Sequence, residues 1–322
     1  MSLYFTYFTD AHFSARPPGR RVDDYTTSLI TKLRFIREWT NKREGHCLFG
    51  GDLLHVKGPL SPANTKGLLS RLIRELSEFR DKKIYGVVGN HDVQYDRLDT
   101  VSNQPLGVLA AAEAFEILWE PKIFEEAGVR VEVVPFHTGP ELDVLDRILR
   151  TPPRAKGVDY RIGIAHAMAR PGGVQEMHGQ AIIGYDLLED IDFDVFLWGH
   201  DHSRVEPKEV GACTHFHPGS MARAALSGDE VDRPVTLLGL KFTSEGWGFK
   251  ETEIPVQPTE VVFRTADKGV EKASEGSEIK GFLQGMQESI GSIEIADPLK
   301  ILDELCKEDP KLKALVLELC EY

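Results

Sequence analysis

The hydrophobic positions along the chain form short apolar runs that alternate with segments of helical spacing. Residues 3–9 are aromatic and β-branched, which predicts a buried strand. Residues 23–39 and 64–79 instead place apolar side chains at every third or fourth position, which predicts two amphipathic helices. The same criteria predict further helices at residues 106–118 and 143–149, and further strands at residues 47–49, 84–88, 129–136, 161–165, 195–198 and 234–238.

This alternation of strands and helices predicts an α/β protein in which helices cover the faces of the sheets. The pattern changes near residue 250, where polar segments become longer. Beyond that point we expect strands at residues 253–256 and 261–263 and helices at residues 279–290 and 298–322. The chain is therefore expected to divide into a large domain over residues 1–247 and a small α+β domain over residues 248–322.

Side chains that can bind metal ions directly follow five of the predicted strands. In α/β folds, ligands collect at the carboxyl ends of the strands, so these side chains are expected to meet. The five motifs are Asp10-Ala11-His12, Gly50-Gly51-Asp52, Gly89-Asn90-His91-Asp92, the lone His166 and Gly199-His200-Asp201-His202.

Most of these motifs are weak evidence when they are taken one at a time. A Gly-Asp pair is usually a turn, and a lone histidine such as His166 is usually a structural residue. In an extended chain, residues i and i+2 point the same way, so Asp10 and His12 would converge on one point, as would His200 and His202. The stretch from Gly89 to Asp92 is the most specific, because Asn and His together suit a metal ligand beside a proton donor.

Taken together, the motifs predict a site for two divalent metal ions. Asp52 would bridge the two ions, which leaves each with about four protein ligands and room for water and substrate. A mixed nitrogen and oxygen set favours Mn²⁺, with Fe²⁺ or Zn²⁺ as alternatives, over magnesium or calcium. The predicted ligands are Asp10, His12, Asp52, Asn90, His166, His200 and His202. His91 would remain outside this set as the proton donor or electrophilic partner of the phosphate.

Composition and charge narrow the range of functions. The chain has 322 residues, a net charge of -13 and four scattered cysteines, which indicates a globular protein with reduced thiols. The negative charge argues against a broad basic surface for nucleic acid, but it does not exclude a nuclease whose metal ions offset part of it. No apolar run is long enough to span a membrane and no secretion signal is evident, so we expect a cytoplasmic protein.

The five motifs, in this order, resemble those of the calcineurin-like metallophosphoesterase superfamily. The resemblance covers roughly residues 4–240 and implies a four-layer α-β-β-α sandwich. A narrower resemblance links the chain to the SbcD-type nucleases that act on DNA double-strand breaks. The segments that carry it are Asp52-Leu53-Leu54-His55, Val134-Pro135-Phe136-His137, His217-Pro218-Gly219-Ser220 and, more weakly, residues 297–302. The chain departs from that family at Phe13-Ser14 and at Asp201.

The narrower resemblance implies a DNA exonuclease, with endonuclease activity as a further expectation, and makes His55 a contact for the substrate phosphate. It also implies a homodimer and a coiled-coil ATPase partner of the SbcC type, which the two C-terminal helices would bind. Two alternatives stay open. One is a small-molecule phosphodiesterase or phosphatase with the same two-metal site, and the other is a non-catalytic scaffold, which the full ligand set disfavours.

Overall fold

Two six-stranded mixed sheets form the centre of the protein. The computed structural model describes residues 2–58, 61, 64, 67–173, 175–177, 180–224 and 233–264. The first sheet has the order β15-β14-β1-β2-β3-β4 and contains β1 (Leu3–Phe8), β2 (His46–Phe49), β3 (Ile84–Gly86), β4 (Phe115–Ile117), β14 (Thr236–Thr243) and β15 (Gly246–Glu253). The second has the order β12-β13-β11-β7-β6-β5 and contains β5 (Lys122–Glu126), β6 (Val129–Phe136), β7 (Tyr160–His166), β11 (Val195–Gly199), β12 (Val205–Val210) and β13 (Cys213–His217).

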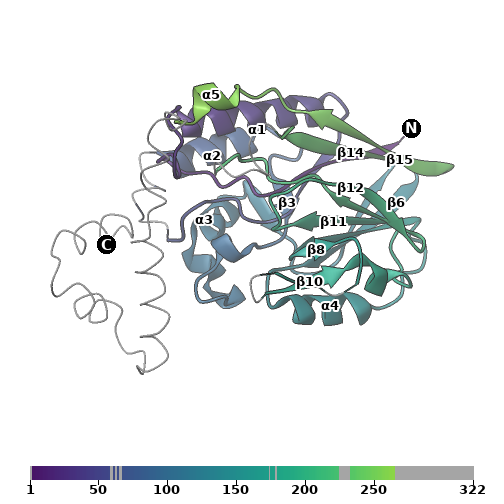
Figure 1. The fold of residues 1–322 in the computed structure, drawn as a ribbon. Coiled ribbons are helices and arrows are strands. Elements are labelled where there is room, and N and C mark those ends of the chain that lie inside the picture. The colour runs from purple at the N-terminus through teal and green to yellow at the C-terminus, as the bar shows by residue number, and fades with distance from the viewer. Residues whose placement is uncertain are drawn as a thin grey trace, which may run out of the picture. The chain divides into compact units, whose positions relative to one another are not determined.

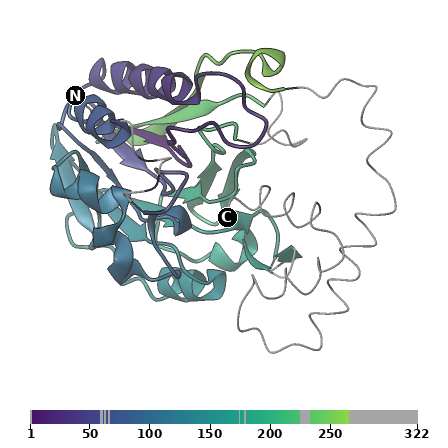
Figure 2. The same ribbon diagram turned by 90° about the vertical axis from the view of Figure 1, so that its left-hand side faces the viewer.

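Helices cover the outer face of each sheet, and this confirms the predicted four-layer α-β-β-α sandwich (Figures 1 and 2). On the first sheet lie α1 (Tyr25–Asn41), α2 (Leu68–Leu76) and α3 (Pro105–Ala111). On the second lie α4 (Glu141–Leu149), the short helix η3 (Tyr185–Leu188) and part of a small sheet made of β8 (Ala169–Arg170), β9 (Gln175–Met177) and β10 (Gln180–Gly184).

Alternating side chains along each strand divide the core into layers. In β2, Leu48 packs between the two sheets, whereas Cys47 and Phe49 pack against the helices of the first sheet. In β1, Phe5 and Tyr7 likewise enter the layer between the sheets. Successive side chains of a strand point to opposite faces, so a strand buried on both faces reads as the unbroken apolar run seen in the sequence.

Parallel pairing brings the predicted site to one edge of both sheets. Strands β1, β2, β3 and β4 run parallel to one another, and so do β6, β7, β11 and β13. The carboxyl ends of β1 and β2 lie level, because Phe8 is paired with Phe49. Those of β7 and β11 also lie level, because Gly199 is paired with His166. The loops that carry the motifs therefore leave the sheets side by side.

Four predicted elements are wrong in part. Of the strand expected at residues 253–256, only Glu253 belongs to a strand, the end of β15. The helix expected over residues 106–118 ends at Ala111, since Glu113 adopts a left-handed φ of 58° and the next residues form β4 beside β3. The helix expected from residue 64 begins only at Leu68, after Gly67 with a φ of 77°. The strand expected at residues 261–263 is instead the end of the short helix α5 (Thr259–Val262).

The first sheet continues past the predicted domain boundary. Strand β15 pairs with β14 over its whole length, from Gly246 beside Thr243 to Glu253 beside Thr236. The predicted boundary at residues 247 and 248 thus falls inside a strand of the large domain. Residues 265–322, where the small α+β domain is expected, lie outside the described residues, so the division remains a prediction. Among the described helices, none is long and apolar enough to cross a membrane.

Candidate metal centre

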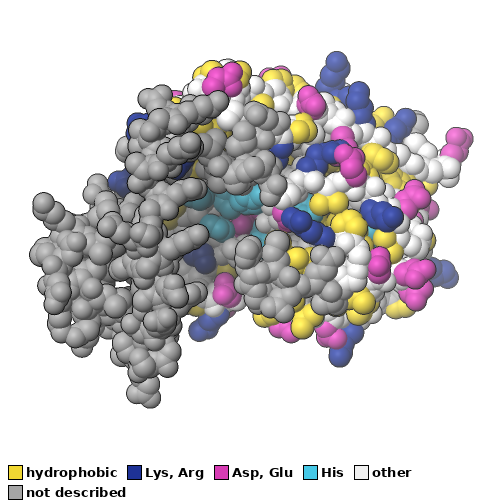
Figure 3. Space-filling view, viewed as in Figure 1, with side chains coloured by type: hydrophobic (Ala, Val, Ile, Leu, Met, Phe, Trp, Pro, Cys, Tyr) yellow, Lys and Arg dark blue, Asp and Glu magenta, His cyan; other side chains and the backbone are white. Residues whose placement is uncertain are grey.

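All seven predicted ligands lie at the shared carboxyl edge of the two sheets. Asp10 and His12 follow β1, Asp52 follows β2, and Asn90 opens the short helix η1 (Asn90–Asp92) after β3. The remaining three come from the second sheet, where His166 ends β7 and both His200 and His202 follow β11. In the space-filling view of Figure 3, histidine side chains reach the surface on this face of the molecule.

The ligand atoms form two groups with Asp52 between them. Atoms of Asp10, His12 and His202 lie within 4.8 Å of one another, as do atoms of Asp52, His166 and His200. The Oδ2 atom of Asp52 lies 3.4 Å from Nε2 of His166 and 3.8 Å from Nε2 of His12. Asp52 can therefore bridge the two groups, as predicted. The expectation that His200 and His202 would converge on one point is wrong, because they divide between the groups.

Asn90 belongs to the second group, since its Oδ1 lies 3.0 Å from Nε2 of His166. The contacts inside the groups fit divalent cations better than they fit ordinary packing. The Nε2 atoms of His12 and His202 face each other at 3.0 Å. The Oδ1 atom of Asp10 is buried and has no hydrogen-bond partner. Buried polar atoms are rarely left without a hydrogen-bond partner. A cation bound by the Nε2 atoms of His12 and His202 and by Oδ1 of Asp10 would satisfy all three atoms. Together with the mixed nitrogen and oxygen donors, this supports a dinuclear divalent metal site.

The backbone reaches this geometry through left-handed turns, not through the extended chain that the spacing suggested. Asp10, His12, Asp52 and His200 all have positive φ, at 51°, 45°, 59° and 89°. Such conformations are unfavourable for residues with a Cβ, and they persist where the surroundings fix them, most often at functional sites. The convergence of Asp10 and His12 was thus predicted correctly, but for a reason that the structure contradicts.

Hydrogen bonds around the ligands hold them in place. Thr9 Oγ1 donates to Asp10 Oδ2 at 2.6 Å, and the N–H of His200 donates to the same oxygen at 3.1 Å. His166 Nδ1 donates to the carbonyl of Gly50 at 2.7 Å, which directs its Nε2 toward the metal position. These supporting residues were not predicted, apart from Gly50, which stands in a motif.

Asp92 connects the loops that follow β2 and β3. Its carboxylate is buried and accepts hydrogen bonds from the N–H groups of Asp52, Leu53 and Gly89 at 2.9, 3.2 and 2.9 Å. Asp92, the last residue of the Gly89–Asp92 motif, therefore stabilises the two loops and is not a metal ligand. Its side chain fixes the loop of Asp52 relative to the loop of Asn90.

The segment after β13 also supports the site. Ser220 Oγ donates to the carbonyl of Asp10 at 2.8 Å, and the N–H groups of Met221 and Ala222 donate to the carbonyls of Thr9 and Asp10. Gly219 has a φ of 76°, which favours glycine. Ser220, in one of the segments on which the narrower predicted resemblance rests, therefore helps to position a metal ligand.

Gly89 provides a direct test of how closely the loops pack. A Cβ on Gly89 would lie 2.1 Å from Asp52 Oδ1, so Gly89→Ala must displace the bridging carboxylate. We expect this variant to lose metal affinity and activity by about 10- to 100-fold, as for other losses of ligand support. Metal analysis and a phosphoesterase assay measure both. Gly248→Ala, whose Cβ would meet no atom within 4 Å, is the matched control. Normal metal content in Gly89→Ala would show that the loops carrying Gly89 and Asp52 are not packed closely enough for the added methyl group to displace Asp52.

Burial and charge give the histidines different protonation states. Burial lowers the pKa of His12 well below its usual range, and burial together with the charge of His166 lowers that of His200 to about 3. Both rings are neutral at pH 7 and can offer a lone pair. His166 differs, because burial opposes its charge but the Asp52 carboxylate outweighs burial and raises the pKa to about 9. In the metal-free protein a proton therefore stands on His166 where a metal ion would bind.

Metal affinity should consequently rise with pH. Below the raised pKa of His166 its imidazolium proton must leave before a cation can bind, and above that pKa the requirement disappears. We expect affinity to increase by about tenfold per pH unit between about pH 6 and pH 8, with one proton released. Isothermal titration calorimetry in buffers of different ionisation enthalpy measures that proton. Affinity that stays constant over this range would contradict the assignment of His166 as a ligand.

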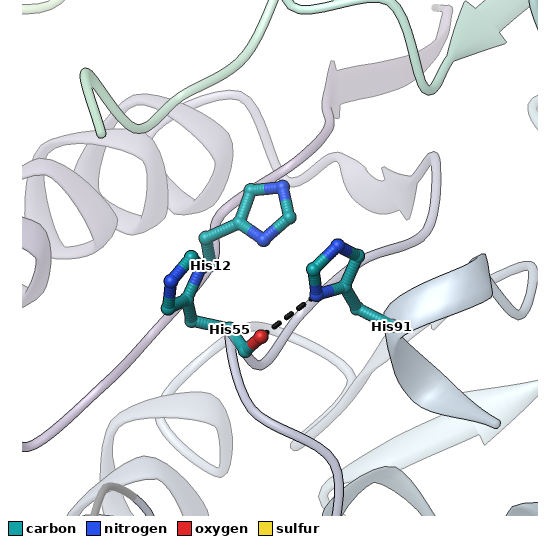
Figure 4. Close-up of side chains that lie close together, drawn as sticks. All are labelled: His12, His55 and His91. Carbon is teal, nitrogen blue, oxygen red and sulfur yellow. Dashed lines mark hydrogen bonds between the residues drawn. The ribbon is translucent and has the colours of Figure 1, made fainter. Parts of the chain in front are cut away.

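His55 and His91 lie next to the first metal group. Figure 4 shows that the rings of His12, His55 and His91 lie close together. One nitrogen atom from each of these residues lies within 4.8 Å of the other two. His91 Nδ1 donates to the backbone carbonyl of His55 at 2.7 Å, and the His91 N–H donates to Asp52 Oδ1 at 2.8 Å. Both predicted residues are thus at the site. Their roles as proton donor and substrate contact remain predictions.

Asp201, one of the positions at which the chain departs from the SbcD-type pattern, has a structural explanation. Its carboxylate accepts a hydrogen bond from Arg170 Nε at 2.7 Å, and its carbonyl accepts one from His217 Nε2 at 2.8 Å. The Asp201 carboxylate belongs to neither metal group and is paired with an arginine. The metal ligands are unaffected by the departure.

Comparison with known proteins agrees with this geometry. Residues 4–204, well over half of the chain, match the calcineurin-like phosphoesterase family. The chain belongs to this family. Membership and the two ligand groups together make it a metal-dependent phosphoesterase, and this confirms the predicted superfamily and enzyme class. No curated protein matches the chain.

Solved structures similar to this phosphoesterase include enzymes with different substrates. A novel archaeal phosphodiesterase is 14% identical, with 78% of this chain and 99% of that chain covered and a TM-score of 0.39. The 5′-nucleotidase precursor from Thermus thermophilus is 14% identical, with 88% and 60% covered and a TM-score of 0.47. The 5′-nucleotidase from Candida albicans is 13% identical, with 79% and 52% covered and a TM-score of 0.45. The chain spans little more than half the length of these two nucleotidases.

Proposed function

We propose that this phosphoesterase hydrolyses phosphodiesters and that its substrate is DNA, cut as an exonuclease of the SbcD type and also internally. The observation that carries phosphoester hydrolysis is the position of Asp52 between two ligand groups, with His91 beside them. The choice of DNA is supported by the resemblance of residues 52–55 and 217–220 to SbcD-type nucleases. Both segments lie at the site, where His55 packs beside His91.

The residues at the site divide the chemical work between them. Asp10, His12, Asp52 and His202 would hold one cation, and Asp52, Asn90, His166 and His200 the other. When bound, two divalent cations acidify a water molecule and offset charge on the phosphoryl oxygens, with Mn²⁺ the cation that we propose. The backbone N–H of His91 donates to Asp52 and its Nδ1–H donates to the His55 carbonyl, which leaves Nε2 free of these contacts. In the imidazolium form, Nε2 would donate its proton to the leaving oxygen and the ring would become neutral.

The second candidate is a phosphodiesterase or phosphatase for small molecules. It is favoured by the pairing of arginines near the metal groups. Arg170 is bound to Asp201, and Arg204 is bound to Glu206 and Glu251. Arginines held by carboxylates contribute less to phosphate binding along a DNA strand, and the net charge of -13 acts in the same direction.

Degradation of end-labelled DNA separates the two candidates. Duplex and single-stranded DNA are incubated with the Mn²⁺-loaded protein, and bis(p-nitrophenyl) phosphate serves as a small diester in parallel. Progressive shortening of the DNA supports the nuclease, and the ladder gives its polarity. Intact DNA together with hydrolysis of the small diester would overturn the nuclease in favour of the second candidate.

We further propose that residues 298–322 bind a coiled-coil ATPase of the SbcC type and that the protein forms a homodimer. The support is the amphipathic pattern of this segment, which lies outside the described residues, and the SbcD resemblance. Deletion of residues 298–322 should abolish co-purification of the ATPase while the small diester is still hydrolysed. Retention of the ATPase by the shortened protein would contradict the proposal, and sedimentation analysis tests the dimer.

A further inference from the structure

Residues 220–223, the supporting segment, lie after β13 and next to the loop of Asp10. All four of their backbone carbonyls accept hydrogen bonds from buried basic side chains of distant parts of the chain. Lys32 donates to Met221 at 2.8 Å, Arg21 to Arg223 at 2.6 Å, and Arg233 to Ser220 and Ala222 at 2.6 and 2.7 Å. One short stretch of backbone is therefore held on its carbonyl side by basic residues.

Lys32 is the most unusual of these donors. It lies in α1 among apolar residues that pack on the first sheet, and it is only 3% exposed. Burial, together with the charges of Arg21, Arg223 and Arg233, lowers the pKa of Lys32 well below the usual range of lysine. An amine buried among cations costs free energy, and an apolar side chain of similar length would avoid that cost. Core stability therefore does not explain this lysine, whereas its contact with the supporting segment does.

The supporting segment contacts two of the three ligands of the first metal group. The N–H of Ala222 and the hydroxyl of Ser220 donate to the Asp10 carbonyl at 3.2 and 2.8 Å. The N–H of Ser220 donates to the His202 carbonyl at 3.1 Å. The segment therefore joins the loop after β1 to the loop after β11, and a shift of its backbone would move Asp10 and His202 together.

The two metal groups take their support from different parts of the protein. The third ligand of the first group is held by α1, because the Tyr25 hydroxyl donates to the His12 carbonyl at 3.0 Å. The second group is supported from the loops after β2 and β3, where Asp92 accepts from the Asp52 N–H and the Gly50 carbonyl accepts from a ligand histidine. A change in α1 should therefore reach the first group before the second.

We propose that Lys32 is a positioning residue for the first metal ion. It holds the Met221 carbonyl and so fixes the supporting segment, which in turn fixes Asp10 and His202. Lys32 thereby raises the affinity of the first metal position and leaves that of the second nearly unchanged. This inference rests on the two-metal site of the proposed function and deepens it, because it gives each metal position its own support.

A merely structural role for Lys32 would have a different signature. If the lysine only satisfied a buried carbonyl, its replacement would lower the melting temperature and would either leave metal binding unchanged or weaken both positions alike. The ratio of the two metal dissociation constants is therefore the readout, and the melting temperature is recorded for every variant.

Mn²⁺ titration calorimetry measures this ratio. Two ligand variants, His202→Ala and His200→Ala, each remove a ligand of one group and so identify which binding step belongs to which position. We expect Lys32→Met, which keeps the apolar length but cannot donate, to weaken the first position by about 10- to 100-fold relative to the second. Lys32→Gln keeps a neutral donor and should recover most of the lost affinity.

Two further variants separate position from stability. Leu33→Ala is the matched control, because it removes a fully buried side chain from the next position of α1 and should leave the ratio at its parent value. Ser220→Ala removes the hydroxyl that contacts the Asp10 carbonyl. Because Lys32 acts through the same segment, Lys32→Met combined with Ser220→Ala should weaken the first position by less than the product of the two single effects.

An unchanged ratio in Lys32→Met, or single effects that multiply in the double variant, would overturn the positioning role and leave the two-metal site standing. A parent protein that bound no Mn²⁺ would overturn the two-metal site itself. A parent that bound two Mn²⁺ ions but hydrolysed neither DNA nor bis(p-nitrophenyl) phosphate would contradict the proposed function, while a selective effect of Lys32→Met would still support the positioning role.

Discussion

Replacement of Asp52 by Asn is expected to lower phosphodiester hydrolysis by at least about 100-fold, since even supporting residues of metal sites contribute up to that factor. Asp52 is the one carboxylate of the second group, and its Oδ2 also lies 3.8 Å from His12 of the first. Although burial acts in the other direction, the charge of His166 and its hydrogen bond to the carboxylate lower the pKa of Asp52, so the residue is ionised. Asn keeps the shape but removes the charge that draws both cations.

The metal content should fall together with the rate. Inductively coupled plasma mass spectrometry is expected to find two ions per chain in the parent and one or fewer in Asp52→Asn. Asp190→Asn, at an exposed position away from the site, serves as the control for loss of a single negative charge. Two tightly bound ions in Asp52→Asn, at an unchanged rate, would show that Asp52 does not bridge them.

Replacement of His91 by Ala is expected to lower turnover by about 100- to 10,000-fold while the metal content stays near that of the parent. The reason is geometric. His91 lies outside both the group of Asp10, His12 and His202 and the group of Asp52, His166 and His200. Its Nδ1 is already engaged by the His55 carbonyl. Its loss should therefore remove a proton donor and not a ligand. The effect should be smaller for substrates with a good leaving group, such as p-nitrophenol, than for DNA.

The alternative is that His91 binds a cation together with His12 and His55, whose atoms are close enough to do so. In that case His91→Ala would lose metal. His46→Ala, at a half-buried histidine paired with Asp81 and outside the three histidine groups, controls for loss of an imidazole. Metal loss in His91→Ala but not in His46→Ala would assign His91 as a ligand and leave the proton donor unidentified.

The parts of the site that follow from strand order were predictable from the sequence. Apolar runs such as residues 195–198 mark strands buried on both faces, and parallel strands place the residues that follow them at one edge. That argument alone brings His166 beside His200, and Asp10 beside Asp52, without knowledge of any distance. This prediction required only that the apolar runs be recognised as strands of the same two sheets.

What depends on local backbone conformation was not predictable. The left-handed turn at His200 separates it from His202, whereas those at Asp10 and His12 leave these two ligands in one group, and no spacing rule indicates this difference. Strand β4 was missed because its residues follow Ala110 and Ala111, whose high helix propensity extended the predicted helix, whereas parallel pairing with β3 decides the outcome. The stabilising role of Asp92 could not be predicted, because it depends on the loops after β2 and β3 being adjacent in space.

Anomalous diffraction from crystals soaked in Mn²⁺ tests the two-metal site most directly. We predict two peaks, one among Asp10, His12 and His202 and the other among Asn90, His166 and His200, with the Asp52 carboxylate between them. A single peak, or a peak among His12, His55 and His91 in place of the first, would contradict the bridging role of Asp52 and the role of His91 as a proton donor.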